Sequence, residues 1–255
     1  MYGIIIFNNI DNISEERFEY IKKRIITFLS IIFDSEHKYS DILSKIDIVR
    51  TIEDVEISGY FDAFSKSITI ENLENNNDLD SIIIHELNHV KFKKNNAYDY
   101  NYREENTYDE KFIGCYFLDE FNSRYQSYKL TGLSFEKCIK IKEDYKKIIE
   151  LYDTNFKKVL SKIRKIHGDE KILSNPKVID ILKAEKRKTD RKKIYNLANY
   201  VACEKWLYEN DQCIIDDVKI NILVNEISVM NFDKINEGDI KFVATFVKNI
   251  LSLGQ

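Results

Sequence analysis

Residues 78–94 read DLDSIIIHELNHVKFKK and contain the pattern H-E-x-x-H at His85, Glu86 and His89. Asn77 and the aspartates that follow it supply a cap and negative charge, and the lysines at the end supply positive charge, so the stretch is predicted to be a helix. On a helix, residues four positions apart lie about 40° apart on one face and roughly 6 Å apart along the axis. Two imidazoles placed in this way can bind one metal ion.

The glutamate beside the first histidine adds the chemistry of hydrolysis. Zinc binds neutral imidazole nitrogens at about 2.0 Å and keeps a position for water, which Glu86 can reach as a general base. The chain has only four histidines, and half of them lie in this pattern. The alternative is a surface helix whose histidines merely face water. We therefore predict a metal site of the kind that peptidases use.

The same helix carries an aliphatic arc. At about 100° per residue, Leu79, Ile83 and Leu87 fall together, and His85 and His89 fall on the other side. We expect the aliphatic arc to lie in the core and the histidines to face a cleft or solvent.

A zinc site with two histidines needs a third protein ligand. Phe92 and Asn95 stand where the longer pattern H-E-x-x-H-x-x-G-x-x-H would have glycine and histidine, so we expect a downstream carboxylate instead. The acidic candidates are Glu104, Glu105, Asp109, Glu110, Asp119 and Glu120. The first two lie among Asn and Tyr residues without a helical period and are predicted to be in a loop.

Glu120 is the favoured third ligand. Residues 110–128 are predicted to form a helix, and Glu120 falls in the middle of its apolar arc. An ionised carboxylate on an apolar face is costly unless it is paired or binds a metal. Ser123, one turn on, is small enough to let this helix approach the H-E-x-x-H helix. The alternative for Glu120 is an i,i+4 ion pair with Arg124, which has little energetic value.

These two motifs together resemble those of the glutamate-type zincins, or gluzincins, in which two helices supply His, His and Glu to one zinc ion. Glu120 follows His89 by 31 residues, and its form E-x-x-S, with Ser123, is similar to that of compact bacterial and phage-associated metallopeptidases, including the family that cleaves repressors of mobile elements. The resemblance covers about residues 45–128. It departs from the thermolysin-like form N-E-x-x-x-D, because Arg124 stands where that form has its aspartate.

The resemblance implies a zinc-dependent metallopeptidase of α+β fold that holds one Zn²⁺ per chain and hydrolyses a peptide or protein substrate. His85, His89 and Glu120 would bind the metal, and Glu86 would activate its water. Three tyrosines are chemically able to stabilise the oxyanion: Tyr108, Tyr116 and Tyr125. Two alternatives stay open. One is a zincin-like metal-binding sensor or regulatory protein without turnover, and the other is a non-enzymatic helical interaction protein in which H-E-x-x-H is accidental.

A small mixed sheet is predicted before the histidine helix. Residues 3–8, 46–50, 56–64 and 66–71 have the length and composition of short strands, and residues 14–33 are predicted to form a helix. In the zincin arrangement, the strand before the active-site helix is an edge strand that pairs with an extended substrate. We therefore expect the last of these strands to border the cleft, and the alternative is an ordinary amphipathic strand with no ligand.

The second half of the chain is predicted to be helical. Apolar residues spaced alternately by four and three over residues 145–166 form a heptad-like seam on a helix that ends at His167 and Gly168. Such a seam usually packs within its own domain, and a coiled-coil dimer is the alternative. Later helices are predicted from Pro176 and over residues 194–208, 216–230 and 239–253. We predict a zincin-like catalytic domain over residues 1–132 and a helical domain over residues 133–255 that completes the cleft.

The charge and the cysteine content of the chain limit which partners and which cellular compartment are expected. Residues 183–193 (KAEKRKTDRKK) form the only notable basic run, and the chain has 39 Lys and Arg against 43 Asp and Glu. We interpret the run as a solvated segment between helices and predict no nucleic-acid partner. The apolar run at residues 25–33 is too short to span a membrane, so no membrane partner is expected. The cysteines form no C-x-x-C pair, which favours a reducing, cytoplasmic compartment: Cys115, Cys138, Cys203 and Cys213.

Overall fold

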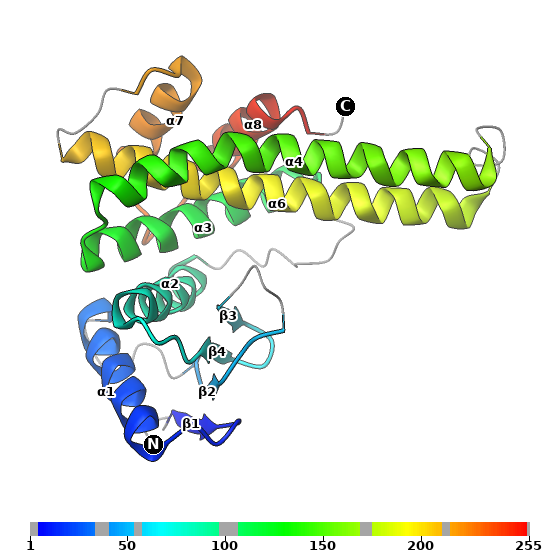
Figure 1. Ribbon diagram of the computed structural model, residues 1–255. Helices are drawn as coiled ribbons and strands as arrows, with labels where there is room; N and C mark the ends of the chain where they lie inside the picture. The colour runs from blue at the N-terminus through cyan, green and yellow to red at the C-terminus, as the bar shows by residue number, and fades with distance from the viewer. Residues whose placement is uncertain are drawn as a thin grey trace. The chain divides into compact units, whose positions relative to one another are not determined.

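The computed structural model describes residues 5–33, 41–53, 58–96, 107–168, 175–210 and 215–253. Within these ranges the chain is α+β, mostly helical with one small mixed sheet, as the sequence predicts (Figure 1). It divides into two compact units. The first comprises Met1–Tyr98, Asn122–Leu133 and Asn231–Lys234, and the second comprises Asp99–Phe121, Ser134–Met230 and Ile235–Gln255. The predicted division at residue 132 stays a prediction.

The sheet of the first unit has the strand order β1-β2-β4-β3. Its strands are β1 (Ile6–Asn9), β2 (Lys45–Val49), β3 (Gly59–Asp62) and β4 (Ser67–Glu71). Helix α1 (Glu15–Ile32) connects β1 to β2, which pair in parallel, as a strand–helix–strand unit requires. β2 and β4 are also parallel, and β3 is antiparallel to β4. Residues 3–4 and 56–57 of the predicted strands lie outside the described residues.

Strand β4 lies inside the sheet. It pairs with β2 on one side and with β3 on the other, so the prediction that residues 66–71 border the cleft is wrong. The alternation of polar and apolar residues concerns the two faces of a strand and carries no information on its edge position. Both faces of β4 are in fact covered, as Ser67 and Thr69 are only 6% and 7% exposed. Among the described strands, β3 is the one that lies at the edge beside β4.

Helix α2 (Asn76–Asn95) packs with α1 and the sheet in one apolar core. The aliphatic arc predicted for this helix is buried in that core, as Leu79, Ile83 and Leu87 have no exposed surface. Other members of the core include Ile21, Ile25, Ile46, Ile48, Ile68 and Ile70.

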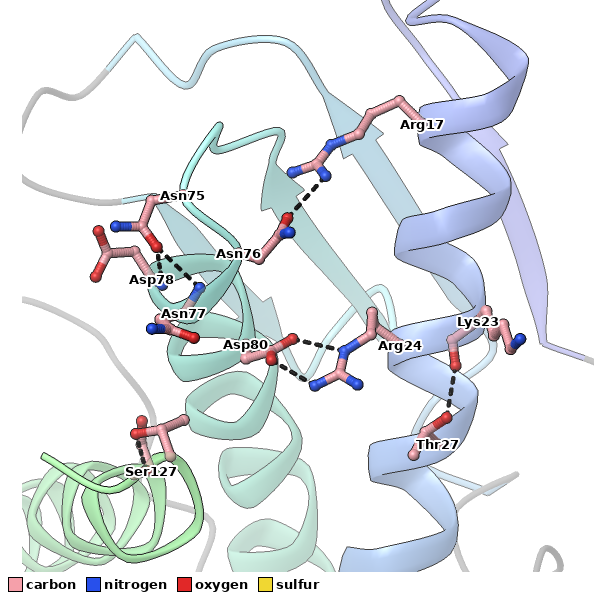
Figure 2. Close-up of polar contacts among 11 residues, drawn as sticks. Arg17, Lys23, Arg24, Thr27, Asn75, Asn76, Asn77, Asp78, Asp80 and Ser127 are labelled. Carbon is pink, nitrogen blue, oxygen red and sulfur yellow. Dashed lines mark hydrogen bonds and ion pairs between the residues drawn. The ribbon is translucent and has the colours of Figure 1, made fainter.

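Two arginines of α1 hold the start of α2 in place (Figure 2). Arg17 donates a hydrogen bond to the side chain of Asn76 at 2.9 Å, and Arg24 forms a two-armed ion pair with Asp80. The helix is capped by Asn75, whose Oδ1 accepts hydrogen bonds from backbone N–H groups two and three residues on. The prediction of Asn77 as the cap is therefore wrong by two residues.

The second unit is helical. Its helices are the first part of α3 (Glu110–Thr131), α4 (Phe135–His167), α6 (Pro176–Glu209), α7 (Val218–Ser228) and α8 (Glu237–Leu251). The last turns of α3 belong to the first unit, so this one continuous helix contributes to both. In the described part of the chain, no helix is long and apolar enough to cross a membrane.

Helix α4 runs beside α6 (Figure 1), although Ile166, at the end of the heptad-like seam, is 74% exposed. The rings of Tyr145 and Tyr200 stack at 4.4 Å, and Lys193 pairs with Asp153. The basic run at residues 183–193 lies inside α6, so its interpretation as a segment between helices is wrong. The run consists mostly of strong helix formers, which favours the continuation of α6 through it, and Lys193 near its end also pairs with Asp153 of α4.

Candidate metal centre

The two histidines of H-E-x-x-H lie near the middle of α2 and are buried. His85 is 5% exposed, His89 8% and Glu86 4%. Of the two alternatives expected for the histidines, a cleft or solvent, this burial excludes open solvent. The last turns of α3 cover this side of α2, where Ser127 donates a hydrogen bond to the carbonyl of Ser81 at 2.9 Å.

The Nε2 atoms of His85 and His89 face each other at 3.0 Å. Their ring centroids are 4.5 Å apart, and the ring planes are inclined by 84°. Two nitrogens bound to one tetrahedral zinc at 2.0–2.1 Å stand about 3.3 Å apart. The spacing of four residues thus directs two imidazole nitrogens at one point, at close to the separation that such an ion requires.

Glu120 lies close to the two histidines. One ligand atom from each of His85, His89 and Glu120 lies within 4.8 Å of the others, and all three side chains are buried. Glu120 stands on α3 one turn before Ser123, whose hydroxyl meets His89. Two imidazole nitrogens and a carboxylate oxygen are a donor set that suits zinc and leaves a fourth position open.

Ser123 meets both histidines. Its Oγ lies 3.2 Å from Nδ1 of His89, and it is fully buried. When Nε2 of His89 faces a metal ion, Nδ1 carries the proton and donates to this hydroxyl, which fixes the ring orientation. Sequence reasoning gave Ser123 only a packing role. The spacing of three residues, which places it on the face of α3 that carries Glu120, was the available signal.

The surroundings of His85 keep its imidazole neutral. Burial and the positive charge of Arg124 hold the pKa of His85 well below its usual range, with a smaller contribution from His89. A hydrogen bond with the Ser123 main chain acts in the opposite direction. Because only the neutral imidazole binds a metal ion, this environment favours the ligand form of the side chain.

Glu86 lies between the histidine pair and the edge strand. Its Oε1 is 4.0 Å from Nε2 of His85. A Cβ atom built on Gly59 of β3 would come within 3.2 Å of Cγ of Glu86 and within 2.6 Å of Cγ2 of Ile82. The main chain of β3 therefore packs directly on α2 at this point. Sequence reasoning missed Gly59, although a glycine inside a predicted strand often indicates a close approach of this kind.

The three tyrosines considered as oxyanion stabilisers lie in different surroundings. Tyr108 donates a hydrogen bond to Asp190 of α6 at 2.9 Å, and burial together with that carboxylate raises its pKa. The Tyr116 ring stacks on Phe112 at 5.5 Å, one turn before Glu120, and Tyr125 is 7% exposed. The role of oxyanion stabiliser stays a prediction for each of the three tyrosines.

Several acidic candidates do not join the histidines. Glu110 pairs with Lys248 of α8 at 3.4 Å, and Asp119 is buried beside Glu120 at a different angle of the helix. Glu104 and Glu105 lie outside the described residues, as does Cys213. Among the described residues, His85, His89 and Glu120 are the group whose geometry suits a metal ion. Comparisons with protein-family models, with curated proteins and with solved structures gave no match.

Proposed function

We propose that this protein is a zinc-dependent metallopeptidase in which His85, His89 and Glu120 hold the ion and Glu86 acts as general base. The observation that carries the proposal is the meeting of two histidine nitrogens and one carboxylate oxygen within 4.8 Å, beside a buried glutamate. Three protein ligands with an open fourth position are typical of catalytic zinc sites, whereas structural sites usually have four.

The residues of the site divide the chemistry between them. When bound, zinc supplies a Lewis acid that lowers the pKa of water and polarises the peptide carbonyl. Glu86, adjacent to the histidine pair, accepts the proton of the attacking water and can return it to the leaving amine. Ser123 orients His89, and the neutral state of His85 keeps its nitrogen available.

The edge strand supports a peptide substrate. Strand β3 pairs with β4 on one side, and the main chain at Gly59 lies against Glu86. An extended peptide that added to the other side of β3 by main-chain hydrogen bonds would pass this glutamate. In the proposal, β3 thus takes the role that the sequence assigned to residues 66–71.

One observation favours a second candidate, a metal-binding sensor or regulatory protein without turnover. All four residues of the site are between 4% and 8% exposed, so a peptide has little access to the metal ligands, as suits a metal-binding role without turnover. Both candidates require the same metal ligands. They differ in whether Glu86 has a chemical function.

The test combines metal analysis with a hydrolysis screen. The purified protein, loaded with zinc, is incubated with unfolded casein and with an internally quenched peptide library, and cleavage is followed by fluorescence and mass spectrometry. The proposal expects cleavage that is lost in Glu86→Gln, whereas the matched control Glu16→Gln, an exposed glutamate of α1, retains it. Zinc binding without any cleavage in the parent protein would favour the sensor.

A further inference from the structure

The basic run of α6 has a counterpart on α4. We define the basic arm as residues 154–168 of α4 and its cap together with residues 175–193 of α6 and its cap. These two ranges contain 13 Lys and Arg against 3 Asp and Glu, residues 169–174 between them add one Lys, one Asp and one Glu, and the whole chain has 39 against 43. The rest of the chain is correspondingly acidic. Such a separation of charge indicates a polyanionic partner more than a general solubilising surface.

The cations of the arm lie on the outer sides of its two helices. The inner side of α4 carries Phe156, Val159 and Ile163, none of which is exposed, while lysines and arginines follow the opposite side of the helix. Eight basic side chains of the arm are exposed: Lys157, Lys158, Lys162, Arg164, Lys165, Lys177, Lys183 and Lys188.

Among the described residues of the arm, few carboxylates balance these charges, although Asp153, just before it, pairs with Lys193. Asp190 is fully buried, where it accepts a hydrogen bond from Tyr108 and pairs with Lys186 at 3.0 Å. Asp190 therefore neutralises an inner lysine and leaves the surface unchanged. Only Asp180 and Glu185 among the acidic residues of the arm are exposed, so the described surface of the arm is strongly positive.

We propose that the basic arm binds nucleic acid through the phosphate backbone, without reading sequence. About 14 helical residues at 1.5 Å each extend roughly 21 Å, which corresponds to about six base-pair steps of duplex DNA. Duplex DNA presents one negative charge per about 1.7 Å, and this regular density suits lysines distributed along two helices better than the sparse charges of an acidic peptide do. The proposal is independent of the metallopeptidase proposal.

Residues 183–193 are part of a helix and not a flexible link between helices. A solvated link between helices would not be expected to bind nucleic acid, because the chain as a whole has slightly more acidic than basic residues. Within α6, however, residues 183–193 are held in fixed helical geometry beside a second basic helix. The acidic remainder of the chain would repel a duplex, and so confines its binding to the arm.

The experiment measures binding of the full-length protein to a fluorescein-labelled 20-base-pair duplex by anisotropy at 50 and 150 mM KCl. Two triple Lys→Gln variants remove equal charge from exposed positions. The arm variant changes Lys157, Lys158 and Lys162, and the control variant changes Lys140, Lys219 and Lys241. The expected result is salt-sensitive binding that the arm variant weakens about tenfold or more, with a salt slope smaller by about two to three, and that the control variant changes less than about twofold.

Three outcomes would overturn the proposal. They are no binding at 50 mM KCl, equal weakening by the two variants, and competition by poly-glutamate as strong as that by unlabelled duplex, which would instead indicate an acidic protein partner. Circular dichroism of each variant checks the fold. The corresponding triple Lys→Arg variant keeps the charge of the arm and is expected to bind as the parent does, whereas weakened binding would contradict a purely electrostatic contact.

Discussion

Ser123 Oγ lies 3.2 Å from Nδ1 of His89, at the point where α3 covers the H-E-x-x-H helix. The serine therefore links α3 to α2 through Nδ1 of His89, the ring nitrogen that does not face His85. Hydrogen bonds of this kind set which nitrogen of a histidine is available to a metal, and their loss typically weakens metal affinity by 10–100-fold. The small residue of E-x-x-S thus has a specific role beyond allowing close packing.

Changing Ser123→Ala is expected to weaken zinc binding about tenfold or more, because His89 loses the acceptor that fixes its ring. The measurement is a competition titration with a chromophoric zinc chelator. Ser127→Ala is the matched control, since Ser127 is also buried on α3 and bonds Ser81 of α2 without touching a histidine. It is expected to lower thermal stability and to leave zinc affinity unchanged. Equal zinc affinities for the two variants would remove the orienting role.

Glu86 and Glu120 are expected to respond differently to mutation. Glu120→Ala should weaken zinc binding itself, because a ligand is lost, while Glu86→Gln should retain one zinc per chain and lower any hydrolysis at least about a hundredfold. Zinc titration of both variants beside the parent decides between these roles. If Glu120→Ala binds zinc as tightly as the parent, the third ligand lies elsewhere, with Glu110 or Asp119 next, and Glu120 is the helix partner of Arg124.

The metal-free protein is expected to lose stability as the pH falls below about 6.5. His85 has a folded-state pKa well below the unfolded value of about 6.5, so below this pH the unfolded chain binds a proton that the folded chain does not. The free energy of unfolding should then fall by up to about 1.4 kcal/mol per pH unit for this one group. Urea unfolding with a chelator at pH 7.5, 6.5 and 5.5 measures the slope. If the His85→Gln variant shows the same dependence of unfolding free energy on pH as the parent protein, other groups cause that dependence.

Gly59→Ala tests the close approach of β3 to α2. The added methyl would lie 2.6 Å from Cγ2 of Ile82 and 3.2 Å from Cγ of Glu86, so the strand must shift. We expect a stability loss of about 1–3 kcal/mol, the usual cost of overpacking, and reduced peptide cleavage with zinc content unchanged. The double variant Gly59→Ala/Ile82→Ala removes the closest clash and should recover part of the loss. No change in unfolding midpoint for Gly59→Ala would show that β3 moves freely.

The amino-acid sequence alone determined the features that depend on local geometry. A spacing of four residues on a helix brings His85 and His89 to one face, and the apolar arc of residues 110–128 sets Glu120 apart as a carboxylate in need of a partner. The helical continuity of the histidine segment and the α+β class follow from periodicities that neighbouring residues impose on each other.

Only the tertiary structure decided which distant residues meet. Whether β3 or β4 lies at the sheet edge depends on pairing between strands, and the alternation in β4 is the same in either position. The hydrogen bond of Ser123 to His89, the close approach of Gly59 to Glu86 and the burial of the histidines all need two elements to pack together. Likewise, Lys193 of α6 meets Asp153 of α4 across 40 residues, a contact that no local pattern contains.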